Sequence, residues 1–369
     1  MTHNKLYYLV GLAGAGKTAV CKQLASSVEG GVALQTSGHF MNFIKYKGIK
    51  SPIELDLISS SERESLINGL HHSFEDDKAN NSFTFLDGHM QVENKNTGLR
   101  INAMASENKG ISTGLIYLNT PSSMIFNNVR QDNISGERER KTESISELQK
   151  LAEDEFQAAE DYCLNNKIEF GVLNNSDPSF SFDKKYNEDV RYLNNYYLPS
   201  SDDLRNKYIN QFSSILTPSI LRKQHYEIGK MLVQPFVDKT GLNIEDYQVL
   251  SIPRSGNYIA GGFTVDFDGR LLMSKDPSEI NSQIDFKKPL VIIDSVIDSG
   301  NTVSNIINGL PASFTQPIYV LCMAINIKSL DLIESFKNKA SFLCLGFSNK
   351  EGRPTGVADM VARLYGTPS

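Results

Sequence analysis

The sequence contains no tryptophan and only four cysteines in 369 residues. The cysteines are far apart, and no two of them form a C-x-x-C pair: Cys21, Cys163, Cys322 and Cys344. A zinc site of the usual spacing and a disulfide framework are therefore not indicated. We expect four reduced cysteines, buried as small apolar side chains.

The sequence also lacks an excess of basic residues and any long apolar run. Lys and Arg total 37 against 43 Asp and Glu, which gives a net charge of −6. No basic tract of the nucleic-acid-binding type is present, so the composition argues against a DNA or RNA partner. No apolar stretch approaches the roughly 20 residues that a membrane-spanning helix needs. The first residues show no signal-peptide pattern, and we expect a cytoplasmic protein without a membrane partner.

Short apolar runs alternate with helical segments, which predicts an α/β fold with mostly parallel sheets. The length suits two domains. Between them the sequence becomes turn-rich, with many Asn, Asp and Tyr residues. The sequence therefore predicts a first domain at 1–178, a linker at 179–200 and a second domain at 201–369.

The apolar runs give the expected strands. In the first domain they are Leu6–Val10, Phe83–Leu86, Leu115–Leu118 and Ile168–Leu173, with helices from Lys17 to about Ser27 and over 144–166. In the second domain helical sequence covers Leu204–Phe236, and the strands are Gln248–Ile252, Leu290–Ile293, Ile318–Met323 and Ser341–Leu345.

Residues Gly11–Thr18 match the pattern G-x-x-x-x-G-K-[ST] in full, between an expected strand and an expected helix. Glycines let successive backbone N–H groups face phosphate oxygens, and a helix N-terminus favours negative charge. Lys17 would neutralise phosphate charge during transfer, and the Thr18 hydroxyl would bind Mg²⁺. We predict an ATP-binding loop made of Gly11, Gly14, Ala15, Gly16, Lys17 and Thr18; the alternative is a glycine turn with an accidental lysine.

The expected strand at 83–86 ends in Asp87-Gly88-His89. A carboxylate at the end of a neighbouring strand suits a magnesium site, so Asp87 joins Thr18 as an expected metal ligand. An Asp-Gly turn without function is the simpler alternative for Asp87. His89 is either a contact of the phosphoryl acceptor or an ordinary loop histidine.

Three arginines, Arg130, Arg138 and Arg140, lie around a glycine beyond the third strand. They suit a mobile lid that places guanidinium groups on the transferring phosphate and excludes water. The alternative is a solvated charged face.

Residues 1–173 resemble the adenylate kinase-like nucleoside monophosphate kinases, especially the archaeal type. The likeness rests on the P-loop, on Thr36-Ser37-Gly38 before a helix at Phe40–Tyr46, on Asp87-Gly88-His89, on the arginines and on the long helix after them. It implies that Ser37, Gly38, Asp87 and His89 hold the acceptor. The family usually has an arginine in the helix after Gly38, whereas this chain has Lys45 and Lys47.

A second motif follows the expected strand Leu290–Ile293. Two carboxylates, Asp294 and Asp298, are four residues apart and precede a Ser-Gly-Asn-Thr turn that opens a helix at Val303–Leu310. Such a turn offers backbone N–H groups and hydroxyls to a terminal phosphate, and the carboxylates could hold sugar hydroxyls. Helix capping alone would explain one aspartate but not the pair.

This motif resembles the phosphoribosyl diphosphate signature of type I phosphoribosyltransferases. Arg254-Ser255-Gly256 resembles the diphosphate loop of that family, and 352–367 resembles the uracil-recognition segment of uracil phosphoribosyltransferases. The resemblance implies that Asp294 and Ser295 contact ribose hydroxyls and that Gly356 and Asp359 lie near the base. It further implies a 5′-phosphate site at Asp298, Ser299, Gly300, Asn301 and Thr302, and a diphosphate site at Arg254, Ser255 and Gly256.

The match to the uracil enzymes has three departures. Asp298 stands where they usually have Ala and where purine enzymes have a proton-transferring aspartate. Their Pro-Gly-Leu-Gly-Asp stretch is here Thr355–Asp359, and a later Asp is Ala362. The phosphoribosyl site is thus better matched than the base site.

Together the two halves predict a bifunctional salvage enzyme. The second domain would make a nucleoside monophosphate from a uracil-like base and phosphoribosyl diphosphate, with Arg254 and Asp298 as catalytic residues. The first domain would phosphorylate it with ATP and Mg²⁺ through Lys17 and the three arginines. The alternatives are a kinase whose second domain only senses phosphoribosyl diphosphate or a nucleotide, and a nucleoside or small-metabolite kinase unconnected to it. A homodimer through the second domain is also expected.

Overall fold

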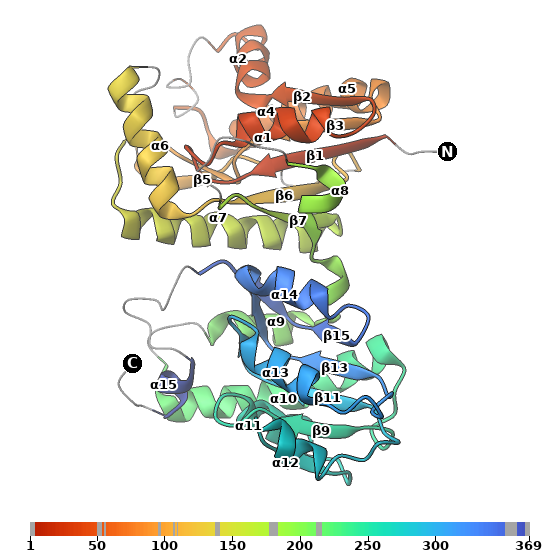
Figure 1. Ribbon diagram of the computed structural model, residues 1–369. Helices are drawn as coiled ribbons and strands as arrows, with labels where there is room; N and C mark the ends of the chain where they lie inside the picture. Colours follow the sequence, from red (N-terminus) through yellow and green to blue (C-terminus); the bar gives the residue numbers. More distant parts are fainter. Residues whose placement is uncertain are drawn as a thin grey trace. The chain divides into compact units, whose positions relative to one another are not determined.

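The computed structural model describes residues 4–49, 54, 57–94, 97–105, 108, 110–136, 141–176, 184–211, 216–350 and 360–365. The chain divides into two compact units, Met1–Asn194 and Asn195–Ser369. Both are mixed α/β structures with parallel sheets (Figure 1). Among the described residues, no helix is long and apolar enough to cross a membrane.

The first unit is built on a six-stranded sheet in the order β2-β3-β1-β6-β7-β8. Its strands are β1 (Lys5–Val10), β2 (Gly31–Gln35), β3 (Phe83–Asp87), β6 (Gly114–Asn119), β7 (Glu169–Asn174) and β8 (Arg191–Tyr192). All neighbours are parallel except β7 and β8. The four strands expected from the sequence are confirmed, because each is a short apolar run buried in the sheet.

Helices connect these strands. They are α1 (Lys17–Ser26), α2 (Thr36–Tyr46), α4 (Ser60–Ser73), α5 (Glu75–Asn80), α6 (Ser122–Ser135), α7 (Ile145–Asn166) and α8 (Tyr186–Asp189). Helix α1 contacts β2 and β3, and α7 contacts β6 and β7 (Figure 1). Helix α7 begins in a reciprocal capping box between Ser144 and Glu147, which accounts for its predicted start. A small antiparallel hairpin, β4 (Gln91–Glu93) and β5 (Arg100–Asn102), had no counterpart in the sequence prediction.

The second unit has a five-stranded parallel sheet in the order β10-β9-β11-β13-β15. Its strands are β9 (Gln248–Ser251), β10 (Leu271–Met273), β11 (Leu290–Ile293), β13 (Ile318–Leu321) and β15 (Ala340–Leu343). A smaller parallel sheet continues beyond them, with β12 (Val296–Ile297), β14 (Ala324–Asn326) and β16 (Gly346–Ser348). Its helices are α9 (Asp202–Asn210), α10 (Pro218–Thr240), α11 (Gly256–Phe263), α12 (Pro277–Asn281), α13 (Asn301–Gly309), α14 (Leu330–Ser335) and α15 (Met360–Tyr365).

Elements in both units also differ from the sequence prediction. The helical stretch Leu204–Phe236 contains two helices, because α9 ends at Asn210 and Thr217 caps the start of α10. The expected strand Ile318–Met323 stops at Leu321, since the Met323 N–H donates to the Ser295 carbonyl and the chain enters the smaller sheet. The segment expected as a linker, 179–200, contains α8 and β8, and β8 pairs with β7 of the first unit.

The four cysteines are buried and free, as expected. In the second unit, α10 and α11 pack closely against each other through glycines, and α11 contacts β9 and β11 (Figure 1). A Cβ atom on Gly262 of α11 would lie 1.9 Å from the Tyr226 carbonyl oxygen of α10. On Gly261 the nearest atoms, in the Tyr226 ring, would be 3.9 Å away.

We expect Gly262→Ala to lower the free energy of unfolding by about 2 kcal/mol or more, because the added methyl group forces two packed helix backbones apart. Gly261→Ala in the same helix is the matched control. It should be neutral or stabilising by about 0.5–1 kcal/mol, since alanine is the better helix former. Urea unfolding of both variants measures the difference, and equal stabilities would contradict this account of the packing.

Candidate functional sites

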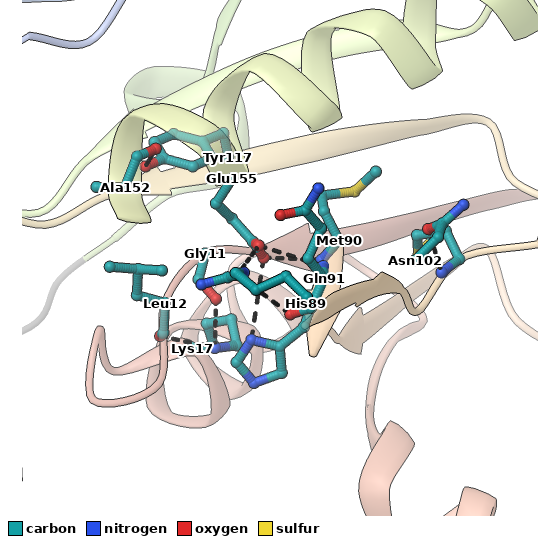
Figure 2. Close-up of polar contacts among 12 residues, drawn as sticks. Gly11, Leu12, Lys17, His89, Met90, Gln91, Asn102, Tyr117, Ala152 and Glu155 are labelled. Atoms are coloured by element: carbon teal, nitrogen blue, oxygen red, sulfur yellow. Dashed lines mark hydrogen bonds and ion pairs between the residues drawn. The ribbon is translucent and has the colours of Figure 1, made fainter. Parts of the chain in front are cut away.

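The first candidate site lies at the carboxyl edge of the six-stranded sheet, where Gly11–Thr18 leads from β1 into α1. Gly16 caps the helix with a φ of 90°, a left-handed conformation that side chains other than glycine rarely adopt. The Lys17 side chain folds over the loop, and its Nζ donates to the carbonyl oxygens of Gly11 and Leu12, each at 2.8 Å (Figure 2). Lys17 therefore lies at the N-terminus of α1, bound to the loop that precedes this helix.

The structure brings together Thr18 and Asp87, the two residues expected as metal ligands. Thr18 Oγ1 donates to Asp87 Oδ2 at 2.5 Å, and Asp87 Oδ1 accepts from the Thr36 N–H at 2.9 Å. Strands β1 and β3 are parallel neighbours, so the residues after them share one edge. A hydroxyl and a carboxylate fit Mg²⁺, which takes oxygen ligands and binds proteins through one or two carboxylates plus substrate phosphates.

Three side chains that sequence reasoning missed hold the carbonyl groups of this loop. Thr120 Oγ1 and Asn175 Nδ2 donate to the Ala15 oxygen at 3.0 and 3.2 Å. Asn128 Nδ2 of α6 donates to the Gly14 oxygen at 2.8 Å. These three side chains therefore fix the positions of two carbonyl groups of the loop.

Two of the expected acceptor residues and one of the expected lid arginines are exposed to solvent. Ser37 and Gly38 lie exposed in the first turn of α2, and Arg130 is exposed on α6. Arg138 and Arg140 lie outside the described residues. His89 follows β3, and its Nδ1 is 3.9 Å from a carboxylate oxygen of Glu155.

Glu155 is a further residue of this site that sequence reasoning did not select. It lies on α7 and has no exposed surface. Its Oε1 accepts from the Met90 N–H at 2.7 Å, and its Oε2 accepts from the Gln91 N–H at 3.2 Å (Figure 2). The same Oε2 accepts from Arg100 Nη2 at 3.0 Å. Burial raises the pKa of Glu155, while these N–H groups and the charges of Arg100 and Lys17 lower it.

The second candidate site lies at the carboxyl edge of the five-stranded sheet. The chain leaves β9 for β10 on one side of the sheet, and it leaves β11 for β13 on the other side. The space between the ends of β9 and β11 is therefore a switch point in the strand order. Ligands of open α/β sheets bind at such a switch point. The loop Arg254–Gly256 follows β9 and Asp294 follows β11, so the sheet places both predicted motifs there.

The two motifs are hydrogen-bonded to each other through Asp294. Ser255 Oγ donates to Asp294 Oδ1 at 2.6 Å, and the Ser295 N–H donates to the same oxygen at 2.7 Å. A Cβ on Gly256 would lie 2.5 Å from the Ile293 carbonyl oxygen, so glycine is needed where the loop meets β11. Ser295 itself is fully buried, and its hydroxyl has no hydrogen-bond partner among the described residues.

Arg254 adopts a φ of 80°, which is unusual for a residue with a side chain. Its carbonyl oxygen accepts from the Tyr365 hydroxyl of α15 at 3.1 Å. Such left-handed residues cluster at ligand-binding positions and persist only where the surroundings hold them.

The turn expected to bind a terminal phosphate leads into α13. Gly300 caps this helix with a φ of 76°, and Ser299, Asn301 and Thr302 around it are exposed. Asp298 is exposed as well, but its carboxylate forms an ion pair with Lys328 Nζ at 2.6 Å and accepts from Asn326 Nδ2 at 3.1 Å.

Lys328 was not selected from the sequence. Lys328 lies two residues beyond the end of β14, at a parallel-sheet edge, whereas the strand expected from the sequence ended at Met323. Gly356 and Asp359, expected near the base, lie outside the described residues.

Burial raises the pKa of Asp294 to about 6, against hydrogen bonds from Ser255 and Ser295 that lower it. An acid with a higher pKa in the folded than in the unfolded protein (about 3.9) stabilises the fold at low pH. That contribution is lost as the pH rises from about 4 through 6.

We therefore expect Asp294→Asn to be more stable than the wild type above pH 7, by about 2–3 kcal/mol. The difference should disappear below pH 4, where Asp294 is protonated in both states. Urea unfolding across pH 4–8 measures it, with the exposed Asp266→Asn as control. A less stable Asp294→Asn at pH 8 would mean that the ionised carboxylate stabilises the site.

No family model matches the chain, and no curated protein matches it. Solved structures with similar folds include the AQ2163 protein from Aquifex aeolicus, at 17% identity and a TM-score of 0.39, covering 46% of this chain and 96% of that one. Adenine phosphoribosyl transferase from Trypanosoma brucei is 16% identical with a TM-score of 0.31, covering 44% and 89%. Hypoxanthine-guanine phosphoribosyltransferase from Schistosoma mansoni is 14% identical with a TM-score of 0.26, covering 41% and 81%. Each of the three is thus similar to less than half of the chain.

Proposed function

We propose that this chain is a bifunctional nucleotide enzyme. Its second unit transfers a phosphoribosyl group from phosphoribosyl diphosphate to a nucleobase, and its first unit phosphorylates the resulting monophosphate with ATP. The observation that carries the proposal is that each unit has its own phosphate-type loop at the carboxyl edge of its own parallel sheet, next to a carboxylate from a neighbouring strand. The product of one site belongs to the substrate class of the other.

In the first unit, the P-loop N–H groups and Lys17 bind the β- and γ-phosphates. Thr18 and Asp87 supply the oxygen ligands for Mg²⁺, which when bound neutralises charge on the transferring phosphate. Arg130, with Arg138 and Arg140, stabilises the same charge. The acceptor phosphate oxygen attacks the γ-phosphorus, and ADP leaves.

In the second unit, Arg254, Ser255 and Gly256 bind the diphosphate, and Asp294 accepts hydrogen bonds from the ribose hydroxyls. Ser299, Gly300, Asn301 and Thr302 bind the 5′-phosphate. The bond from the anomeric carbon to the diphosphate breaks, and Arg254 stabilises the charge that develops on this leaving group. A base nitrogen then bonds to that carbon, and Asp298 accepts the proton that the nitrogen loses.

We expect a uracil-like base, because residues 352–367 resemble the uracil-recognition segment of uracil phosphoribosyltransferases. The second candidate is a kinase whose second unit only binds phosphoribosyl diphosphate or a nucleotide. The ion pair between Asp298 and Lys328 favours it, because this carboxylate already has a cationic partner.

The decisive experiment incubates the protein with Mg²⁺, phosphoribosyl diphosphate and, one at a time, uracil, adenine, guanine and hypoxanthine, with and without ATP. Diphosphate release and nucleotide products are measured. Monophosphate should accumulate without ATP and become nucleoside diphosphate with it. Binding of phosphoribosyl diphosphate without diphosphate release, with every base, would support the sensor instead.

We expect Lys17→Ala to slow the ATP-dependent step at least about 100-fold, because it removes the charge that stabilises the transferring phosphate. Phosphoribosyl transfer should be unchanged in this variant. Lys22→Gln on the exposed side of α1 is the matched control. A Lys17→Ala protein that still makes nucleoside diphosphate at the wild-type rate would remove the P-loop from the proposed reaction.

A further inference from the structure

Among the described residues, those that the sequence suggested for the acceptor side of the first site include no buried cation. Helix α2, where the resemblance would place an arginine, has Lys45, which is exposed. A kinase acting on a neutral acceptor needs no such cation, whereas a kinase acting on a monophosphate has to bind a dianion before the reaction. The surroundings of Lys17 therefore bear on the acceptor class.

Arg100 reaches this place from the β4–β5 hairpin. Its Nη2 donates to the Gln91 carbonyl oxygen at 3.3 Å and to Glu155 Oε2 at 3.0 Å. His89 Nδ1 lies 3.9 Å from the other oxygen of Glu155, and the charge of Lys17 acts on the same carboxylate. One buried carboxylate thus lies near Arg100 and His89, and the charge of Lys17 lowers its pKa as well (Figure 2 labels Glu155, Lys17 and His89).

The guanidinium is only partly used by these contacts. Arg100 Nε is buried and has no hydrogen-bond partner among the described residues, although a buried donor without a partner is unfavourable. The Arg100 side chain is 24% exposed and that of Glu155 0%, so the arginine lies on the solvent side of the pair. Arginine has five donors in a planar fork, which bind a phosphate in a bidentate manner.

Glu155 positions two basic side chains, His89 and Arg100. It accepts the N–H groups of Met90 and Gln91, directly after His89, and it binds Arg100 from the next strand of the hairpin. The Glu155 carboxylate on α7 therefore holds in place both the segment that follows β3 and the guanidinium group of Arg100.

We infer that Arg100 binds the anionic group of the phosphoryl acceptor beside the P-loop, with Glu155 as its positioning residue. This assignment requires an acceptor that carries a phosphate group, as the monophosphate of the proposed function does, and it would not serve a neutral nucleoside. The inference rests on the proposed kinase function of the first unit. It names the residue that binds the acceptor phosphate in that site.

Binding tests the inference separately from catalysis. UMP, uridine, AMP and adenosine are titrated into the full chain with its P-loop filled by a non-hydrolysable ATP analogue and Mg²⁺. The wild type should bind at least one monophosphate 10-fold or more tighter than its nucleoside. Arg100→Gln should lose that preference, Arg100→Lys should keep part of it, and Lys150→Gln on the exposed side of α7 should keep all of it. Affinity for the ATP analogue should change less than twofold in every variant.

Kinetics tests the positioning role. Glu155→Gln keeps one acceptor oxygen, which can still bind the Met90 N–H, but it loses the charged oxygen that accepts from Gln91 and Arg100. KM for the monophosphate should therefore rise about 10-fold while kcat and KM for ATP change little. A general loss of folding would lower all three together and the melting temperature with them.

Two results would overturn the inference: no preference for monophosphates in the wild type, or an undiminished preference in Arg100→Gln. A wild type that binds monophosphates preferentially but transfers no phosphate would contradict the proposed kinase function and leave Arg100 as an anion-binding residue. The two failures are therefore distinguishable.

Discussion

Parallel pairing places the carboxyl ends of neighbouring strands at one edge of a sheet, and both candidate sites depend on this constraint. In the first unit it sets Asp87, at the end of β3, beside the helix that starts after β1, so that the Thr18 hydroxyl meets its carboxylate. In the second unit it sets Asp294, after β11, beside the loop that follows β9. Residues 69 and 39 positions apart in the sequence become hydrogen-bonded partners in this way.

A buried carboxylate organises each site, and the two carboxylates are balanced differently. Glu155 has two backbone N–H groups and a guanidinium around it, which offset part of the desolvation that raises its pKa. Asp294 has one hydroxyl and one N–H on a single oxygen, and burial dominates. Both oxygens of Glu155 thus accept hydrogen bonds that hold its neighbouring loop. The other oxygen of Asp294 has no hydrogen bond to the described residues, and it suits the hydroxyl groups of a ligand.

What could be predicted from the sequence was local. Gly11–Thr18 is read from eight consecutive residues, and the strands are short apolar runs whose burial the structure confirms. Asp87 was found because a strand visibly ends there. Glu155 could not be found, since on α7 it reads as one more polar residue of an amphipathic helix and its partners are 55 to 65 residues away. Arg100 lies in a three-residue strand without a periodic pattern, and Lys328 was passed over because the strand before it was expected to end earlier in the chain.

Helix α6 links two parts of the first site that the sequence presents as separate motifs. Asn128 donates a hydrogen bond to the Gly14 carbonyl of the phosphate loop, and Arg130, two residues further along, is the first of the three expected lid arginines. A helix moves as a rigid element, so the arginine cannot travel far without stretching the hydrogen bond to the loop. Under the proposed kinase function, phosphate binding by the loop and a displacement of Arg130 would therefore share one coupling free energy. By reciprocity, each would then change the equilibrium of the other.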